Sequence, residues 1–569
     1  MRLIRLRLVS LVAAALVAAV FVWATATLPP ARRDVPENAW VGRAGRPWAR
    51  GAFHVHTTRS DGTGTTEEVA VAAARAGLDF VVFTDHGDGT RKVDPPRYLS
   101  GVLCLDGVEL STASGHYAVA GMPPSPYPLG GEARDVVDDV KRLGGFGVAA
   151  HPTSPRPSLR WSDRAAVPDA VEWLNLDSEW RDEPATRLAL AALHYLIRRP
   201  ETVASVLDRP AAAFSEWDRM LRRGRTVGLA AADAHARLGP HTDGEASAAA
   251  TSFHLPSYYA VFCAVSVHVE IGRPFAGQPD SDAAMLLDGL RAGRVFSSVD
   301  AIASPARLDF CAEASGVSGC MGEQLPAGGP VTLRVKAPAI PGLTLALFEN
   351  GDPVKEERAN NLTHRANGRP AVYRVEARLS EAPGMPAVPW VVSNPIYVGP
   401  PLEGPAAARA AATSSTMLAP GRWRVEHDAS SRGTLLGPEN GAGGRLEFRF
   451  ELGTAGARSP FAAIAHSSTP PGGSDRISLR AWATRPMRVS IQLRRPVGHD
   501  GLRWRRSIFI DETPRDVTAF FDDMRAVPPA GPLEPGNTNT LLVVVDDVNT
   551  LPGTAGTIFL ENLRWESSR

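Results

Sequence analysis

Acidic and imidazole side chains recur at the ends of short apolar runs in the first half of this chain. Between about residues 49 and 300, runs typical of buried strands alternate with helical patterns, which predicts an α/β fold with parallel strands and crossover helices. His86, Glu109, His151 and Asp233 each lie at or just after the C-terminal end of such a run. These ends share one face of a β/α barrel, so side chains far apart in the sequence can meet there.

The alternation supplies enough strand–helix units to close a barrel. The predicted strands are residues 51–56, 79–85, 102–109, 116–121, 146–151, 170–175, 227–233 and 294–298. The predicted helices include residues 66–76, 132–143, 185–197, 214–223 and 282–292.

A chain of 569 residues is too long for one hydrophobic core, so about two to four domains are expected. After the barrel at 49–300, short alternating runs predict a small β-sandwich over residues 301–400 that packs on the barrel. Residues 29–48 and 401–418 are rich in Pro, Gly or Ala and are expected to be linkers. Residues 419–569 carry further strand patterns and predict a separate C-terminal β-sandwich.

The N-terminus predicts export. Arg2, Arg5 and Arg7 precede an apolar run over residues 8–28, and no acidic residue occurs before Asp34. The pattern is typical of a signal peptide, and the run is also long enough for one transmembrane anchor, so both alternatives stay open for residues 1–28. Under either alternative the rest of the chain is expected in the periplasm or another extracytoplasmic compartment.

Cysteine content and net charge exclude several classes of site. The chain has four cysteines and no C-x-x-C, so neither a zinc ribbon nor a thioredoxin motif is indicated. Cys311 and Cys320 could pair in an oxidising compartment, but the sequence leaves their geometry open. The formal net charge is zero, which gives no electrostatic case for a nucleic-acid partner.

Six histidines and three acids make up the candidate metal site. His54 and His56 point to the same face if they share one strand, and the turn at 60–62 brings Asp61 close to them. Imidazole and carboxylate ligands without a thiolate suit Zn, Mn or Fe. The candidate ligands are His54, His56, Asp61, His86, Glu109, His116, His151, Asp233 and His235.

The motifs that carry these residues resemble, in order and spacing, those of the PHP (polymerase and histidinol phosphatase) superfamily. They are Phe53-His54-Val55-His56-Thr57, Ser60-Asp61-Gly62, Thr84-Asp85-His86, Gly107-Val108-Glu109, Gly115-His116, Ala150-His151-Pro152 and Asp233-Ala234-His235. The segment from Trp390 to Tyr397 further resembles the carbaryl-hydrolase-like (CehA/McbA-type) branch. The C-terminal strand patterns loosely resemble galactose-binding-like jelly rolls.

The PHP resemblance implies a distorted (β/α)7 barrel that holds two to three divalent metal ions. The implied ligand sets are His54, His56, Glu109 and Asp233 for one ion, Glu109, His116 and His151 for a second, and Asp61, His86 and His235 for a third. Glu109 would then bridge two ions.

The resemblance further implies a metal-dependent hydrolase for a small-molecule ester, with a phosphoesterase that uses a metal-bridging hydroxide as the first hypothesis. An amide or carbamate ester hydrolase on the same site is the close alternative. A non-catalytic carbohydrate-binding or envelope scaffold protein is the alternative from a different class.

The expected catalytic residues are Glu109, Asp233, Arg59 and Asp85. Arg59 and, next to a ligand position, Arg237 could clamp a phosphate. Asp85 is expected either to orient His86 or to cap the following turn. Other candidates near the site are Glu172, Asn175, Glu179 and His241.

Four tryptophans in the C-terminal region allow two interpretations. Their rings could stack on sugars, which would make carbohydrate a partner, or they could form the core of the sandwich. They are Trp423, Trp482, Trp504 and Trp565.

Overall fold

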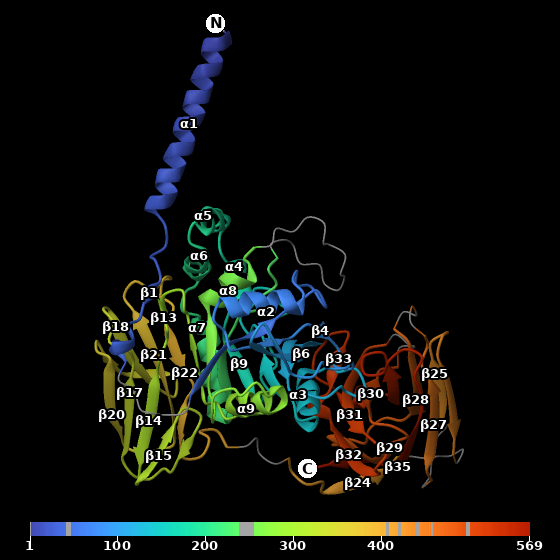
Figure 1. Cartoon of the computed structure of the whole chain (residues 1–569). Coiled ribbons are helices and arrows are strands. Elements are labelled where there is room, and N and C mark those ends of the chain that lie inside the picture. Colours follow the sequence, from blue (N-terminus) through green and yellow to red (C-terminus); the bar gives the residue numbers. More distant parts are fainter. Residues whose placement is uncertain are drawn as a thin grey trace. The chain divides into compact units, whose positions relative to one another are not determined.

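The computed structural model in Figure 1 describes residues 2–40, 47–237, 255–404, 409–418, 423–437, 444–454, 456, 459–496 and 501–568. The chain divides into two compact units. The first comprises Met1–Gly87, Lys92–Pro123 and Val140–Pro405, and the second comprises Asp88–Arg91, Pro124–Asp139 and Ala406–Arg569.

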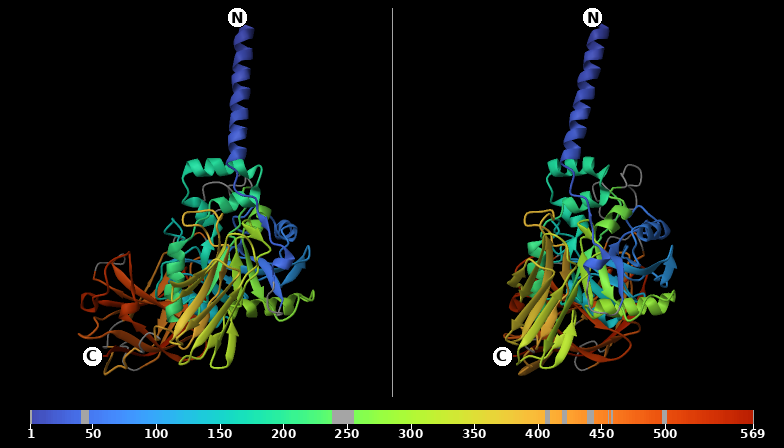
Figure 2. Two further views of the ribbon diagram at one scale, coloured as in Figure 1. Left: turned by 90° about the vertical axis from the view of Figure 1, so that its left-hand side faces the viewer. Right: turned by 60° about the vertical axis from the view of Figure 1, so that its left-hand side comes forward.

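The first unit is built on a curled sheet, which Figure 2 shows from two further sides. Along the sheet the strands follow the order β10 (Val227–Ala231), β9 (Ala170–Asn175), β8 (Phe146–Ala149), β7 (Gly115–Ala120), β6 (Val102–Thr112), β3 (Phe80–Phe83), β2 (Trp48–Val55), β11 (Ser266–Glu270) and β12 (Val295–Ser298). The sheet curls until the end of β2 meets the segment after β10, where Val55 pairs with Ala234. Its interior is filled by apolar side chains such as Phe80, Leu105 and Leu229.

The sheet is mixed, whereas the sequence predicts parallel strands. β2, β3 and β6 are parallel, as are β8, β9 and β10, but β7 is antiparallel to both of its neighbours. The reason lies in the connection, because only two residues join Thr112 to Gly115, and a parallel crossover needs a dozen or more. Gly115 has φ +106°, and a Cβ there would lie 2.4 Å from the carbonyl of Arg160, so this tight turn needs glycine.

The predicted helices all coincide with observed ones. They are α2 (Thr66–Arg75), α3 (Ala133–Arg142), α5 (Ala185–Tyr195), α7 (Ala211–Arg223) and α9 (Pro279–Arg291). α2 begins at a capping box, in which Thr65 accepts the Glu68 amide and Glu68 accepts the Thr65 amide. The sequence pattern does not predict α4 (Leu176–Arg181), α6 (Arg199–Ser205), α8 (Tyr258–Ala264) or β11. α8 and β11 form one nearly continuous apolar run, in which neither period is visible.

Helix α1 (Arg2–Ala26) covers the N-terminal apolar run. Among the residues that the structure describes, no helix combines the length and the apolar character needed to cross a membrane.

Residues 301–400 continue the sheet of the barrel as well as forming a sheet of their own. A four-stranded sheet has the order β15 (Val317–Cys320), β14 (Asp309–Ala314), β17 (Val331–Lys336) and β20 (Asn361–Ala366). The remaining strands belong to the barrel sheet: β16 (Gln324–Leu325), β18 (Leu343–Glu349), β19 (Asp352–Glu357), β21 (Ala371–Leu379), β22 (Val391–Ser393) and β23 (Ile396–Val398). β22 pairs with β12 on one side and with β21 on the other. Cys311 and Cys320 oppose each other on β14 and β15 and form a disulfide.

A buried arginine ties this region to helix α7. Arg374 on β21 is almost completely buried, and its guanidinium donates to both oxygens of Asp218 at 3.0 and 2.9 Å. It also donates to Glu376 at 2.8 Å. Both partners are charged and well oriented, which offsets the cost of burying the guanidinium.

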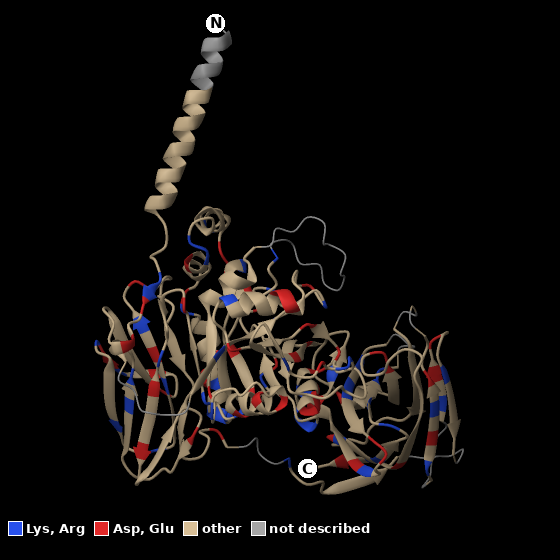
Figure 3. Cartoon of the chain, in the orientation of Figure 1, with Lys and Arg blue, Asp and Glu red and all other residues tan. Residues whose placement is uncertain are grey.

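The second unit is a β-sandwich. One sheet has the order β26 (Arg432–Leu436), β27 (Leu446–Glu451), β35 (Ala555–Ser567), β29 (Arg476–Ala483) and β32 (Arg515–Phe520), with β24 (Ser414–Met417) on β35. The other has the order β25 (Trp423–His427), β28 (Phe461–Ser467), β34 (Thr540–Asp546), β30 (Met487–Arg494), β31 (Arg503–Ile510) and β33 (Arg525–Val527). Apolar side chains from both sheets fill the core, among them Phe448, Leu479, Ile491 and Val543. Acidic and basic residues are interspersed along its strands (Figure 3).

The tryptophans of this sandwich divide into two pairs. Trp504 and Trp565 are buried in the core, so they are structural and cannot stack on a sugar. Trp423 and Trp482 are only partly buried, and their rings lie against His466 and Phe559 respectively.

The second unit also holds a segment from the range predicted for the barrel domain. Asp135 and Asp139 on α3 are buried, and Arg488 on β30 donates to both oxygens of Asp139 at 2.7 and 2.8 Å. Arg506 on β31 pairs with Asp135. The Asn549 side chain donates to the carbonyl of Pro128 at 3.0 Å. The sequence pattern contains no sign of this exchange between the two halves of the chain.

We expect Arg488→Ala to destabilise the second unit by about 3–5 kcal/mol, because it leaves Asp139 buried without its cation. Urea unfolding of the full chain, followed by tryptophan fluorescence, measures the change. Arg432→Ala is the control, since that side chain is 81% exposed and its ion pair with Glu451 should contribute less than about 1 kcal/mol. Equal unfolding midpoints for the two variants would contradict the assignment.

Candidate metal centre

The nine predicted ligands converge at the end of the curled sheet where the parallel strands terminate. They are His54 on β2, His56 and Asp61 after it, His86 on β4 (His86–Gly87), Glu109 on β6, His116 on β7, His151 after β8, and Asp233 and His235 after β10. Their donor atoms form four groups whose members all lie within 4.8 Å of one another: His56, Asp61, His86 and His235; His54, Glu109 and His151; His54, His56 and Asp233; and His86, Glu109 and His116. Because the groups share residues, one side chain can serve two ions.

Glu109 is the centre of the cluster. Its carboxylate is 1% exposed and contacts the imidazoles of five histidines. Oε1 lies 2.9 Å from both His116 Nδ1 and His151 Nε2, and Oε2 lies 3.3, 3.2 and 3.3 Å from His54 Nε2, His56 Nε2 and His86 Nδ1. This carboxylate therefore has the contacts expected of a bridging ligand.

Two further carboxylates complete the cluster. Asp61 Oδ1 lies 3.3 Å from His235 Nε2 and 3.4 Å from His56 Nδ1. Asp233 Oδ1 is buried and accepts no hydrogen bond, and it lies 3.4 Å from Nε2 of both His54 and His56. A buried carboxylate oxygen without a donor is costly unless a cation binds it, so the donor set fits divalent metal ions.

Hydrogen bonds to Nδ1 fix which ring nitrogen four histidines offer to the cluster. Nδ1 of each lies near an acceptor and leaves Nε2 as the ligand atom. The acceptors are Glu172 Oε1 for His54 (2.5 Å), Ser60 Oγ for His56 (3.3 Å), the carbonyl of Leu159 for His151 (3.0 Å) and the carbonyl of Asp233 for His235 (3.0 Å). His116 is oriented the other way, with Nδ1 toward Glu109.

Three of the candidate ligands have left-handed backbone conformations, which set the direction of their side chains. φ is +67° at His54, +32° at His151 and +40° at Asp233, values that residues other than glycine rarely adopt. The sequence predicts that His54 and His56 share a face by simple strand alternation. The left-handed conformation at His54 interrupts that alternation. The pairing of β2 with β3 is irregular between Ala52 and Val55, and this irregularity lets both rings reach the cluster.

The carboxylates and imidazoles of the cluster shift one another's pKa values. Burial alone would lower the pKa of His56, but the nearby carboxylates of Asp233 and Glu109 raise it to about 10. Burial alone would raise the pKa of Glu109, but the imidazoles of His54 and His86 hold it well below its usual range. For His86 burial dominates and lowers the pKa to about 4. Protons on the imidazoles thus balance the charge of the carboxylates. Divalent cations would displace these protons, so the affinity for metal should fall as the pH falls.

The structure shows which neighbours hold two of the predicted catalytic residues. Arg59 pairs with Asp94 and with Asp106, the latter at 3.2 Å, so its guanidinium is already held by two carboxylates. The Asp85 carboxylate is hydrogen-bonded to the turn after His56. It accepts from the backbone and hydroxyl of Thr57, at 2.7 and 2.8 Å, and from Ser60 at 2.7 Å.

Asp85 therefore shapes the turn between His56 and Asp61. Ser60, which donates to Asp85, is the residue that lies against His56 Nδ1. Gly62 closes the same turn, and a Cβ there would lie 2.4 Å from the His56 carbonyl oxygen. Glycine is thus required beside Asp61.

Glu172 and Asn175, both on β9, hold candidate ligands in place by hydrogen bonds. Glu172 is fully buried and joins His54 to the backbone amide of His151, which it accepts at 2.7 Å. The Asn175 amide donates to Glu172 at 2.8 Å and to Asp233 at 3.0 Å. The sequence signal for Glu172 is an acid inside an otherwise apolar strand, but its partners could not be inferred. Among the described contacts, Glu179 has none with the nine ligands, and His241 lies outside the described residues.

No protein-family model and no curated protein matches this sequence. Among solved structures, a two-domain protein from Bacteroides vulgatus containing a predicted PHP-like metal-dependent phosphoesterase is similar over 65% of this chain and 99% of its own, with 13% identity and a TM-score of 0.30. The family 11 carbohydrate-binding module of a cellulosomal cellulase of Clostridium thermocellum is similar over 27% of this chain and 95% of its own, with 15% identity and a TM-score of 0.23. At these TM-scores the similarities assign neither a family nor an activity to this chain.

We expect the purified protein to hold at least two transition-metal ions per chain and Glu109→Ala to lose most of them, because this substitution removes a ligand shared by two groups. Plasma emission spectrometry measures the content. Glu67→Ala, at a side chain 63% exposed, should leave it unchanged. A metal-free but active wild type, or an unchanged metal content in Glu109→Ala, would rule out the assignment.

We expect Glu172→Gln to weaken metal binding by about 10–100-fold without unfolding the protein, since the amide keeps the shape but not the charge opposite His54. Competition against a chromogenic chelator measures the affinity. Glu179→Gln is the matched control, because burial and then Asp182 raise the pKa of Glu179 to about 8 and leave it largely neutral at pH 7. Identical affinities in the two variants would show that Glu172 has no role in positioning the ligand.

Proposed function

We propose that this chain is an exported metal-dependent hydrolase of the PHP superfamily, in its CehA/McbA-type branch, and that it acts on phosphate esters. The observation that carries the proposal is Glu109, whose single carboxylate contacts five imidazoles and belongs to two of the four overlapping donor groups. Export is supported by the arginine-flanked apolar run and by the Cys311–Cys320 disulfide, which is typical of oxidising compartments. As partners we propose a small-molecule ester and, for the C-terminal sandwich, carbohydrate at Trp423 or Trp482.

Divalent ions bound here would polarise the phosphoryl oxygen and lower the pKa of water. In the reaction, the oxygen of one water molecule forms a bond to phosphorus. The bond from phosphorus to the leaving-group oxygen breaks, its electron pair stays on that oxygen, and the oxygen takes the proton that the water gives up. Glu172, Ser60 and Asn175 keep the ligand side chains in place during this exchange.

A cation for the substrate phosphate is provided by Arg237 rather than Arg59. Arg237 follows His235 and lines the cavity beside the cluster, whereas Arg59 is held by two carboxylates. The amide or carbamate alternative uses the same ligands, with a carbonyl carbon in place of phosphorus. Carbonyl substrates carry less negative charge, so they depend less on Arg237.

The test is a substrate panel on metal-loaded protein: an aryl phosphate, an aryl carbamate and an aryl amide with the same aryl group. We expect the phosphate to be hydrolysed, activity to disappear with dipicolinate, and Zn, Mn or Fe to restore it. Hydrolysis in ¹⁸O-labelled water should place the label in phosphate. Turnover of the carbamate or amide alone would establish the alternative bond, and no turnover of any ester by a metal-loaded chain would favour a scaffold protein.

A further inference from the structure

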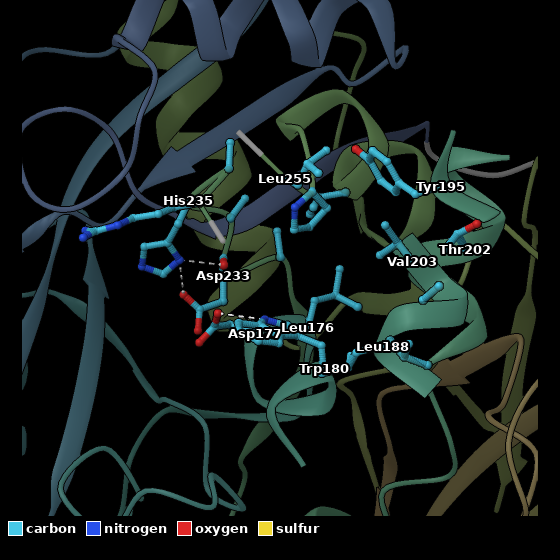
Figure 4. A pocket seen from close by; sticks show the side chains of 18 of the residues that line it. Leu176, Asp177, Trp180, Leu188, Tyr195, Thr202, Val203, Asp233, His235 and Leu255 are labelled. Atoms are coloured by element: carbon cyan, nitrogen blue, oxygen red, sulfur yellow. Dashed lines mark hydrogen bonds and ion pairs between the residues drawn. The ribbon is translucent and has the colours of Figure 1, made fainter. Parts of the chain in front are cut away.

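A cavity of about 240 Å³ lies directly beside the metal cluster (Figure 4). Asp233 and His235 belong both to the cluster and to the wall of the cavity. The rest of the wall comes mainly from the segment between β9 and β10, which contains α4, α5 and α6. Figure 4 shows Asp233 and His235 on one side of the space, with Thr202 and Val203 on the opposite side.

The wall of this cavity is mainly apolar. Its side chains include Leu176, Trp180, Leu188, Val203, Val206 and Val261. A group seated here would bury apolar surface while its neighbouring atoms lay next to the ligands of the cluster.

The polar side chains that α4, α5 and α6 contribute to the wall already have partners within the protein. The Trp180 indole donates to Asp177 at 3.1 Å, and Asp177 is paired with Arg181 at 2.6 Å. The Tyr195 hydroxyl donates to Ser257 and accepts its amide at 2.8 Å. These groups do not need hydrogen bonds from a ligand, and a ligand hydroxyl entering here would lose water without gaining a partner.

The Thr202 hydroxyl also has a partner within the protein, because it donates to the carbonyl of Arg198 at 2.6 Å. The cavity therefore discriminates against sugars and other polyols. Its volume exceeds the about 150 Å³ of an apolar protein cavity that admits benzene. It has room for one to two aromatic rings or an alkyl group of similar size.

We propose that this cavity binds an uncharged apolar group of the ester, so that the natural substrate joins a hydrolysable head to a hydrophobic moiety. The proposal rests on the proposed function, because it assigns the cavity to the substrate of the neighbouring cluster. The head lies against the cluster and Arg237, and the hydrophobic moiety lies among α4, α5 and α6.

The first experiment compares glycerol, phenyl and 2-naphthyl phosphate as substrates of the metal-loaded full chain. Phenol and 2-naphthol are leaving groups of similar acidity, so a difference between those two esters reports binding. We expect KM to fall about tenfold from phenyl to 2-naphthyl phosphate, as burial of four further ring carbons predicts, and glycerol phosphate to be the poorest substrate. A KM that is independent of the aryl group would overturn the proposal.

The second experiment fills the cavity. We expect Val203→Trp to raise KM for 2-naphthyl phosphate at least tenfold, while kcat/KM for phenyl phosphate changes less and metal content stays constant. Val71→Trp is the matched control, because Val71 is a 48% exposed valine on α2 outside the wall of the cavity. Ala191→Phe, on α5, fills the same space and serves if Val203→Trp does not fold. Unchanged KM in a folded cavity variant contradicts the proposal.

A third experiment needs no turnover. Calorimetry should detect binding of 2-naphthol to the wild type and its loss in the cavity variant. If 2-naphthol binds in this way but no ester is hydrolysed, the cavity assignment stands and the proposed function fails. If esters are hydrolysed without preference for size and 2-naphthol does not bind, the function stands and the cavity assignment fails.

Discussion

The buried carboxylate of Glu109 is the constraint on which the rest of the site depends. An ionised carboxylate at 1% exposure is tolerated only with compensating charge and hydrogen bonds on its oxygens. Five imidazoles provide that compensation, and they can reach one side chain only if β2, β4, β6, β7 and β8 all bring their ends to one place. Gly107, two residues before Glu109, shows how close the strands are there, because a Cβ at this position would lie 2.2 Å from the Val119 carbonyl oxygen.

The ligand geometry is obtained at the expense of local backbone stability. Left-handed conformations at non-glycine residues cost of order 1–3 kcal/mol each, and His54, His151 and Asp233 all adopt them. Glu172 contacts two of the three, because it accepts from His54 and from the backbone amide of His151. The same buried acid thus orients a ligand ring and stabilises a strained segment.

Much of this arrangement could be predicted from the sequence, and the failures have physical causes. Strands and helices with a clear period could be predicted, and so could the nine residues that converge in the cluster, because acids and imidazoles stand out at the ends of apolar runs. The antiparallel β7 was missed because strand patterns carry no direction. The sheet continuity through β22 and the ion pairs of Arg488 with Asp139 depend on pairings between residues far apart in the chain, which no local pattern encodes. The two carboxylate partners of Arg59 could not be foreseen for the same reason.

The connection between β9 and β10 joins the chemistry of the cluster to the shape of the cavity. Asn175 is the last residue of β9, and its side chain accepts the amide of Ser178, which caps α4. The same side chain donates to Glu172 and to Asp233, so the start of α4 is held at a fixed distance from the ligands. Residues 176–226, which follow Asn175, contain none of the nine candidate ligands. The helices that line the cavity can therefore change their side chains, and with them the shape of the cavity, without altering the strand ends that hold the candidate ligands.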